Sequence, residues 1–306
     1  RTWYTPSNAY VVVGGDVDHQ AVVDLAARTY GKLKPRALPE RKPQNEPAQA
    51  GIKRVTVKAP AKLPYLAMAW KVPKLTDVDK DREPYALEVL ATVLDGHDAA
   101  RFAKNLVRGS KIAQSAGAGY DGTLRGEATF MFDGQPAEGK TVAELEAALR
   151  AELKRVQDEG VSPEELARVK TQTIASQVYK RDSMMAQAME IGGLEAAGHK
   201  WQDIDTLLEK IRGVTAEEVQ AVAKKYFTDD ALTVAVLDRP RHTHLVESIR
   251  TAGARIKFLP DGDVAGAIMA ASVETIDTGV DLLLGTGGTP EGVIAAAALR
   301  CLGGEI

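Results

Sequence analysis

Three short runs in the last quarter of the 306-residue chain carry the side chains best suited to chemistry. Two arginines flank a rigid proline at 239–241, an Asp-Gly-Asp run lies at 261–263, and a glycine-rich loop spans 285–292. Guanidinium groups form paired hydrogen bonds with phosphate oxygens, and backbone amides at the start of a helix attract anions. Aspartates can hold sugar hydroxyls, and Glu291 can ligate a hard cation. These residue types indicate a site for a sugar phosphate.

Strands and helices are expected to alternate around those runs. The predicted strands are 255–259 and 280–284, and the predicted helices are 243–251, 264–269 and 290–299. This alternation is typical of a parallel sheet, in which ligands gather beyond the carboxyl ends of the strands. The three runs fall at those ends. The last part of the chain is therefore expected to be an α/β fragment with a parallel-sheet pattern.

The first three quarters of the chain have a different pattern. A buried strand is expected at 10–14 and a helix at 18–30, before a proline-rich linker. The further strands are expected at 52–58, 65–72, 112–120, 126–133 and 231–237, with helices at 82–94 and 99–107 and mainly helical structure from 141 onward. This order predicts an α+β layer in which helices cover one face of an antiparallel or mixed sheet.

Three capping boxes support the helical stretch. Thr141 with Glu144, Ser162 with Glu165 and Thr215 with Glu218 each place a hydroxyl three residues before a glutamate. The hydroxyl can accept from an otherwise unpaired amide while the glutamate reaches back to the amide of the first residue. These pairs predict three helix starts.

Ordered motifs in this part resemble the M16 zinc peptidases, the insulinase and processing-peptidase family. They are WYTPSNA with VVVGGD near the start, ARFAKNLVRGSKIA at 100–113, GVSPEELARVK at 160–170 and VTAEEVQAVAKKYF at 214–227. The resemblance covers residues 1–237. It implies the non-metal C-terminal lobe of such a peptidase, because the inverted H-x-x-E-H zinc motif of the family is absent from this sequence.

The resemblance implies no zinc cofactor in residues 1–237 and no catalytic residue there. In active relatives this lobe supplies an arginine and a tyrosine that hold the substrate backbone, a role suited to hydrogen-bond donors around an oxyanion. The aligned positions here are Val107 and Gln114, so Arg108 and Tyr120 are the nearest substitutes. The alternative is that Arg108 is an exposed helix-end residue and Tyr120 part of a core.

The last part closely resembles the class II fructose-1,6-bisphosphatases over residues 237–306. The matching runs are LDRPRH, GARIKFLPDGDVAGAI and GVDLLLGTGGTPEGVIAAAALRCLGGE. By this resemblance Glu291 would bind Mn²⁺ or Mg²⁺. The residues that would bind sugar phosphate are Arg239, Pro240, Arg241, Asp261, Gly262, Asp263 and Gly288. The other carboxylates of the family's metal site have no counterpart here, so an incomplete site is expected.

The chain is thus expected to be a hybrid of four parts. They are the end of a preceding M16-type lobe at 1–37, a linker at 38–50, the M16 C-terminal-type lobe at 51–237 and the phosphatase-like fragment at 238–306. The stretch AVLDR at 235–239 suits both families and is the expected junction. The join can be natural, engineered or an assembly artefact. Because Arg1 opens the chain, its natural beginning is expected upstream.

Composition narrows the class of protein. Apolar residues make up 44% of the chain and the net charge is −3, which fits an ordinary globular protein and gives no basic stripe for nucleic acid. No apolar run is long enough for a membrane span. The peptidase part suggests an exported, periplasmic bacterial protein and the phosphatase part a cytoplasmic one, so the compartment is left open.

Three functions follow from these patterns. The favoured one is a non-catalytic lobe that binds a peptide substrate or closes over a zinc-bearing partner, either an H-x-x-E-H subunit or an upstream lobe. The second is a metal-dependent fructose-1,6-bisphosphatase fragment that hydrolyses a sugar phosphate. The third is a carrier without activity. The first is preferred because its resemblance covers more of the chain.

Overall fold

The computed structural model describes residues 3–42, 49–58 and 64–238. The chain divides into two compact units, residues 1–55 with 66–234 and residues 56–65 with 235–306, and the described residues belong mainly to the first. The expected α/β fragment at 238–306 lies outside the described residues except for Asp238. None of the described helices has the length and apolar character that crossing a membrane requires.

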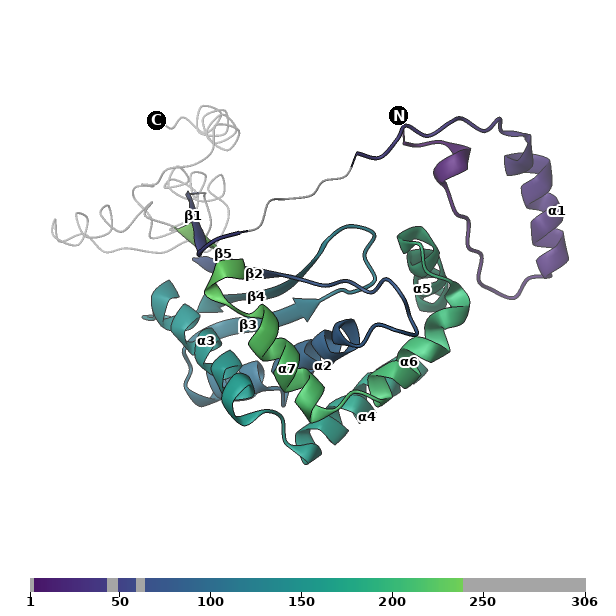
Figure 1. The fold of residues 1–306 in the computed structure, drawn as a ribbon. Helices are drawn as coiled ribbons and strands as arrows, with labels where there is room; N and C mark the ends of the chain where they lie inside the picture. The colour runs from purple at the N-terminus through teal and green to yellow at the C-terminus, as the bar shows by residue number, and fades with distance from the viewer. Residues whose placement is uncertain (1–2, 43–48, 59–63, 239–306) are drawn as a thin grey trace, which may run out of the picture. The chain divides into compact units, whose positions relative to one another are not determined.

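A five-stranded sheet forms the centre of the lobe, with the strands in the order β1-β5-β2-β4-β3 (Figure 1). The strands are β1 (Lys53–Lys58), β2 (Tyr65–Val72), β3 (Ala113–Tyr120), β4 (Ala128–Pro136) and β5 (Leu232–Asp238). β4 pairs antiparallel with both β2 and β3. All five strands that were expected after the linker are present, and β2 has the predicted bounds.

Helices cover one face of this sheet (Figure 1). They are α2 (Glu83–Asp95), α3 (Val142–Glu159), α4 (Pro163–Lys180), α5 (Met184–Ala197), α6 (Ile204–Arg212) and α7 (Ala216–Tyr226), with a short π-helix, η3, at Phe102–Gly109. Side chains alternate between buried and accessible along β2 and β4, as expected for a sheet with one covered face. The predicted α+β layer is therefore confirmed.

An aromatic cluster fills the space between the sheet and the helices. Phe132 of β4 makes edge-on contacts with Trp70, Phe102 and Phe130, with ring centroids 4.9, 5.1 and 5.8 Å apart. Phe227, just after α7, lies 4.8 Å from Phe130. Because alternate residues of a strand share a face, the spacing of Phe130 and Phe132 places both rings in the core.

Two of the three predicted capping boxes form completely. Thr141 and Thr215 each accept from the amide three residues later, and Glu144 and Glu218 reach back to the threonine amides. At α4 only half of the box forms, since Ser162 accepts from the Glu165 amide at 3.2 Å but the Glu165 carboxylate binds Arg101 instead. A charged partner is the stronger one for this carboxylate.

The N-terminal segment departs from the sequence prediction at one point. The expected helix forms as α1 (His19–Thr29), but residues 10–14 form no strand and Tyr10 and Val11 are exposed. The prediction of a buried strand there was wrong. A strand needs a neighbour for its backbone groups, and none of the described strands pairs with this segment.

Candidate functional site

The predicted sugar-phosphate and metal residues are not among the residues that the structure describes. They are Arg239, Pro240, Arg241, Asp261, Gly262, Asp263, Gly288 and Glu291. Their roles remain predictions from sequence. The two predicted peptide-binding residues, Arg108 and Tyr120, do lie in the described lobe.

Arg108 lies in the last turn of η3. The turn is of the π type, with the Ser110 amide donating to the Asn105 carbonyl at 2.8 Å. Arg108 itself is exposed, and its guanidinium donates to the carbonyl of Asp98 in the loop that follows α2. This hydrogen bond ties the exposed guanidinium to the loop that follows α2.

Tyr120 ends β3 and is half-buried. Its hydroxyl donates to the Pro73 carbonyl at 2.6 Å, and its ring stacks on Phe130 with centroids 6.1 Å apart. Burial, followed by the nearby carboxylates Glu88 and Asp121, raises the pKa of the Tyr120 hydroxyl, so it stays protonated as a donor. Arg108 precedes β3 and Tyr120 closes it, and eight residues of strand span roughly 23 Å.

β3 is an edge of the sheet, with β4 as its one neighbour. The Ala118 amide donates to Oδ2 of Asp95, the last residue of α2, at 3.2 Å. An amide that binds a side chain in this way points away from β4. Since backbone groups of a strand alternate in direction, those of Ala116 and Tyr120 point the same way.

Two carboxylates lie beside the middle of β3. Asp133 of β4 is paired with Gly117, and Asp95 lies beside Ala118. Burial raises the pKa of Asp95, the Ala118 amide lowers it, and the charge of Asp133 raises it again, with a net increase. Asp95 forms no ion pair with any lysine or arginine in the described part of the chain. Among the described residues, the Asp95 carboxylate is therefore stabilised by one hydrogen bond, from the Ala118 amide.

Glu88 of α2 is the most strongly perturbed carboxyl beside this strand. Burial, and then the charge of Asp121, raise its pKa to about 7. Across residues 3–42, 49–58 and 64–238, the Glu88 carboxyl has no hydrogen-bond partner. A carboxyl without donors favours its neutral form, which accounts for the direction of the shift.

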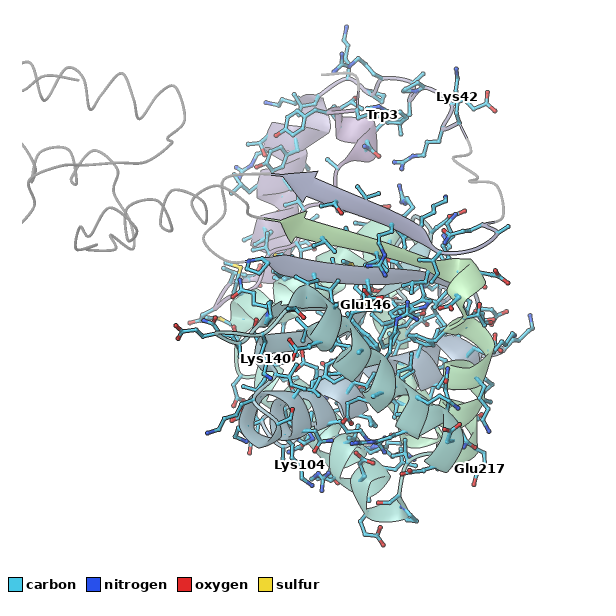
Figure 2. All side chains as sticks on the ribbon, turned by 90° about the vertical axis from the view of Figure 1, so that its left-hand side faces the viewer. Trp3, Lys42, Lys104, Lys140, Glu146 and Glu217 are labelled. Carbon is cyan, nitrogen blue, oxygen red and sulfur yellow. The ribbon has the colours of Figure 1, made fainter. Side chains whose placement is uncertain are left out.

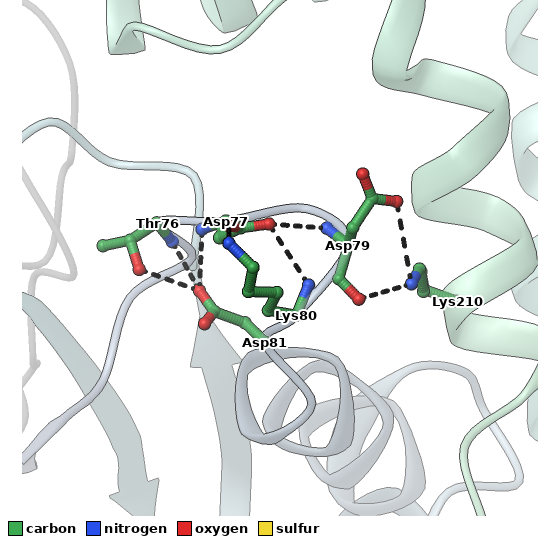
Figure 3. A network of polar contacts seen from close by, with 6 residues as sticks. All are labelled: Thr76, Asp77, Asp79, Lys80, Asp81 and Lys210. Carbon is green, nitrogen blue, oxygen red and sulfur yellow. Dashed lines mark hydrogen bonds and ion pairs between the residues drawn. The ribbon is translucent and has the colours of Figure 1, made fainter.

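Hydrogen bonds and ion pairs hold the loop at 76–81, which precedes α2. The Asp81 carboxylate accepts from the amides of Thr76 and Asp77 at 2.8 and 2.9 Å, and Lys80 pairs with Asp77 at 2.8 Å (Figure 3). Lys210 of α6 donates to the Asp79 carbonyl at 2.7 Å. These contacts use the polar groups of the loop internally, so the loop acts as a support for the start of α2.

Two ion pairs connect different elements of the lobe, one beside η3 and one at β1, which lies at the opposite edge of the sheet from β3. Arg101 forms two bonds to Glu165, at 2.9 and 2.7 Å, and donates to the Gly160 carbonyl. Arg54 of β1 pairs with Glu146 of α3 through two bonds of 2.8 Å, and Figure 2 shows Glu146 where the helices meet the sheet. Paired geometry of this kind fixes orientation as well as adding stability.

His19, His97 and His199, the histidines within the described ranges, belong to no metal-ligating group. His19 is on exposed α1, and His97 accepts from the Ala99 amide through Nδ1 at 3.0 Å. No cluster of three or more His, Cys, Asp or Glu suited to a metal occurs in residues 3–42, 49–58 and 64–238.

Comparison with known proteins assigns the lobe to a class of peptidase-like folds. A protease from Helicobacter pylori has a similar structure, with a TM-score of 0.71 and 23% identity over 78% of this chain and 57% of that one. A peptidase M16 inactive domain from Pseudomonas fluorescens gives a TM-score of 0.59 and 16% identity over 74% and 52%. The family described as "Peptidase M16 inactive domain" matches residues 1–173. The chain belongs to this family, and its described lobe has the fold of the non-catalytic half.

A second family matches the other end of the chain. The description is "Bacterial fructose-1,6-bisphosphatase, glpX-encoded", and the match covers residues 203–306. D-fructose 1,6-bisphosphatase class 2/sedoheptulose 1,7-bisphosphatase from Microcystis aeruginosa is 52% identical over 76 residues, which are 25% of this chain and 21% of that enzyme. The Synechocystis enzyme gives the same values. The chain spans about a fifth of the length of these relatives, so it contains a fragment of their sequence.

Sequence reasoning missed Asp95 and Glu88. The predicted helix at 82–94 contains Glu88 and stops one residue before Asp95, and neither residue was given a role. One signal was available for Asp95, because an acidic residue at a helix C-terminus faces the negative end of the helix dipole and needs a compensating donor. Glu88 gave no such signal, because its burial depends on how α2 packs against β3.

Proposed function

We propose that this chain is a non-catalytic, peptide-binding lobe of an M16-type peptidase that works with a zinc-bearing H-x-x-E-H subunit or lobe. The observation that carries the proposal is the match of the M16 inactive-domain family to residues 1–173, together with the absence of the H-x-x-E-H motif from the sequence. The partner supplies the metal and the attacking water. This lobe supplies a surface that holds the peptide against them.

The geometry of β3 supports this role. Arg108 precedes β3 and has an exposed guanidinium, and Tyr120 ends the strand with its hydroxyl fixed by the Pro73 carbonyl. Open backbone groups lie between them. An extended peptide needs this kind of surface, since its main-chain groups must all be paired.

The proposal is tested by mixing the purified chain with the H-x-x-E-H-bearing M16 protein of the source organism. Light scattering after size exclusion is expected to give a complex of the two, and hydrolysis of a quenched fluorescent peptide is expected only when both are present. Metal analysis of the chain alone checks the assignment of roles. The proposal is contradicted if the chain alone binds stoichiometric zinc and has peptidase activity. It is also contradicted if the two proteins do not associate.

A second function rests on the 52% identity to class 2 bisphosphatases. In this alternative Glu291 contributes to a Mn²⁺ or Mg²⁺ site, and the arginine and aspartate runs bind the sugar phosphate. Phosphate release from fructose 1,6-bisphosphate, measured with and without Mn²⁺, tests it. Because the matched 76 residues are 21% of the relative's length, no release above the blank is expected, and metal-dependent turnover would establish the second function instead.

A further inference from the structure

Helix α5 contributes little of its surface to the core of the lobe. Of its 14 residues Leu194 alone is buried, and Figure 1 shows the helix at one end of the helical layer. Its charged residues are Glu190, which pairs with Lys180 at 2.9 Å, and Glu195, which accepts from the Trp201 amide at 3.1 Å. Because a helix in a protein is normally stabilised by packing its apolar face, an uncovered apolar face on α5 indicates a partner.

An exposed stripe along α5 is apolar and uncharged. The stripe, called the α5 stripe below, consists of Met185, Met189, Gly193 and Ala196, and the helical spacing of these residues places them on one face. The two methionines are 72% and 69% exposed. Solvent-facing positions of a helix are normally polar, so large apolar side chains at this spacing indicate a surface that another molecule covers.

The α5 stripe has a large half and a small half. Methionine occupies its two N-terminal positions, and glycine and alanine occupy its two C-terminal positions. Two copies of the helix packed antiparallel would place the methionines of each copy against the small residues of the other, as ridges fill grooves. Gly193 has the necessary space. Apart from its chain neighbours and its own helix backbone, no atom of the described residues lies within 4 Å of the position that a Cβ would occupy there.

The charges that flank α5 match the same arrangement. Asp182 precedes the helix and Lys200 follows it, both are exposed, and neither side chain forms an ion pair within the described residues. Antiparallel packing would bring the carboxylate of one copy beside the ammonium group of the other at both ends. The pairs 182 with 200, 189 with 193 and 185 with 196 all have their midpoints within one residue of Ile191. A single two-fold axis therefore satisfies all three pairs, as an interface between identical copies requires.

Apolar side chains beside α5 enlarge this surface. A Cβ on Gly192 would lie 3.4 Å from Cγ2 of Val12, so the segment at 10–14 lies against the helix. Val11 and Val13, on either side of Val12, are exposed, and so is Tyr179 near the end of α4. A stable interface needs more area than one pair of helices supplies, and these side chains can contribute to it.

We propose that two copies of this chain associate through antiparallel contact of their α5 stripes. Each copy contributes the same surface, with its methionines set against the glycine and alanine of the other copy and with opposite charges meeting at both ends of the helix pair. The inference goes beyond the proposed peptide-binding function, because this contact needs neither a zinc-bearing subunit nor a peptide.

Sedimentation of the full chain over a range of concentrations tests the proposal. A reversible dimer is expected, with a midpoint on the order of 10 µM. Gly193→Gln fills the space opposite Met189 in the dimer but meets open space in the single chain, and glutamine is the better helix former. The variant is therefore expected to fold and to raise the midpoint at least about tenfold. Ala151→Gln on the exposed surface of α3 is the matched control and should leave the midpoint unchanged. A chain that stays monomeric up to about 500 µM, or a dimer that Gly193→Gln does not weaken, would overturn the proposal.

Exchange of the flanking charges tests the antiparallel direction. Asp182→Lys alone and Lys200→Asp alone each place like charges together at both ends of the helix pair, so each is expected to raise the midpoint about fivefold. The double variant restores opposite charges and is expected to return the midpoint to within about twofold of the natural value. A double variant as weak as the two single ones would reject the antiparallel contact.

Oxidation by hydrogen peroxide locates the contact in the unmodified chain. Thioethers oxidise according to their exposure, so Met185 and Met189 are expected to oxidise more slowly above the dimer midpoint than below it. Met131 on β4, which is also exposed, should oxidise at one rate throughout. A dimer in which Met185 and Met189 keep their reactivity would place the contact elsewhere and overturn the proposal.

The zinc-bearing subunit is the other molecule that could cover the α5 stripe. If the chain is monomeric and Gly193→Gln prevents its association with that subunit, the stripe binds the subunit and self-association is rejected. A monomeric chain that still forms an active complex with the subunit would leave the proposed function standing and reject this inference alone.

Discussion

The carboxyl of Glu88 makes stability depend on pH. Its pKa is raised from the model-compound range to about 7 in the folded chain, so the folded state keeps a proton that the unfolded state loses at lower pH. The stabilisation from this group is complete below the unfolded pKa and is lost as pH rises through about 7. Stability of the natural chain should therefore fall across that window because of this residue.

Glu88→Gln removes the titration. At pH 8 the variant is expected to be more stable than the natural chain by about 2 kcal/mol, and the difference should shrink at pH 5. Urea unfolding of the variant and of the natural chain at pH 8 and at pH 5 measures the difference in unfolding free energy at each pH. Glu138→Gln, an exposed carboxylate after β4, serves as the control and should change neither value. A pH-independent difference for Glu88→Gln would contradict the interpretation.

The Arg101–Glu165 pair is the second residue-scale feature that can be tested. Both side chains are largely buried, at 16% and 17% exposed, so removing one charge leaves the other with little water to replace it. Glu165→Gln is expected to cost about 2 kcal/mol of unfolding free energy. Glu164→Gln, the exposed neighbour, should cost almost nothing. Equal effects in thermal unfolding would show that the pair adds no net stability.

At the scale of elements, α3 depends on its first turn. The capping box of Thr141 and Glu144 satisfies two amides that the helix cannot pair internally. Thr141→Ala is expected to lower stability by about 1 kcal/mol in urea unfolding. Thr171→Ala in the exposed interior of α4 is the matched control, since alanine is the better helix former there. A larger loss at Thr171 than at Thr141 would contradict this explanation.

The same elements show what the sequence could predict. Period-two and helical patterns located β2, β4 and α2 within two or three residues, because each buries one face against the other layer. The edge position of β3 could not be predicted, since it depends on which strands pair across the sheet. The contact between Asp95 and the Ala118 amide could not be predicted either, because it depends on β3 lying at the edge of the sheet. The strand expected at 10–14 fails for a related reason, because an apolar run forms a strand only beside a partner.

At the scale of the whole molecule, the N-terminal segment buries few of its own side chains. α1 has no buried side chain, and large apolar residues of the segment are exposed, among them Tyr4, Tyr10 and Val11. Deletion of residues 1–42 is expected to shift the thermal midpoint by less than about 2 °C, as followed by circular dichroism. The full chain is the reference. A fall of more than about 4 °C would show that the segment stabilises the lobe.

The alternation of backbone direction along β3 also has a kinetic consequence. Amides that point toward β4 are held in a ladder, and their protons exchange with solvent only when the sheet opens. Those of Ala116 and Tyr120 point outward, so they exchange quickly, while Ala118 is slowed by Asp95 alone. Deuterium uptake is therefore expected to be fast at Ala116 and Tyr120 and slow at the residues between them, and uptake at Ala118 reports how often the Asp95 contact breaks.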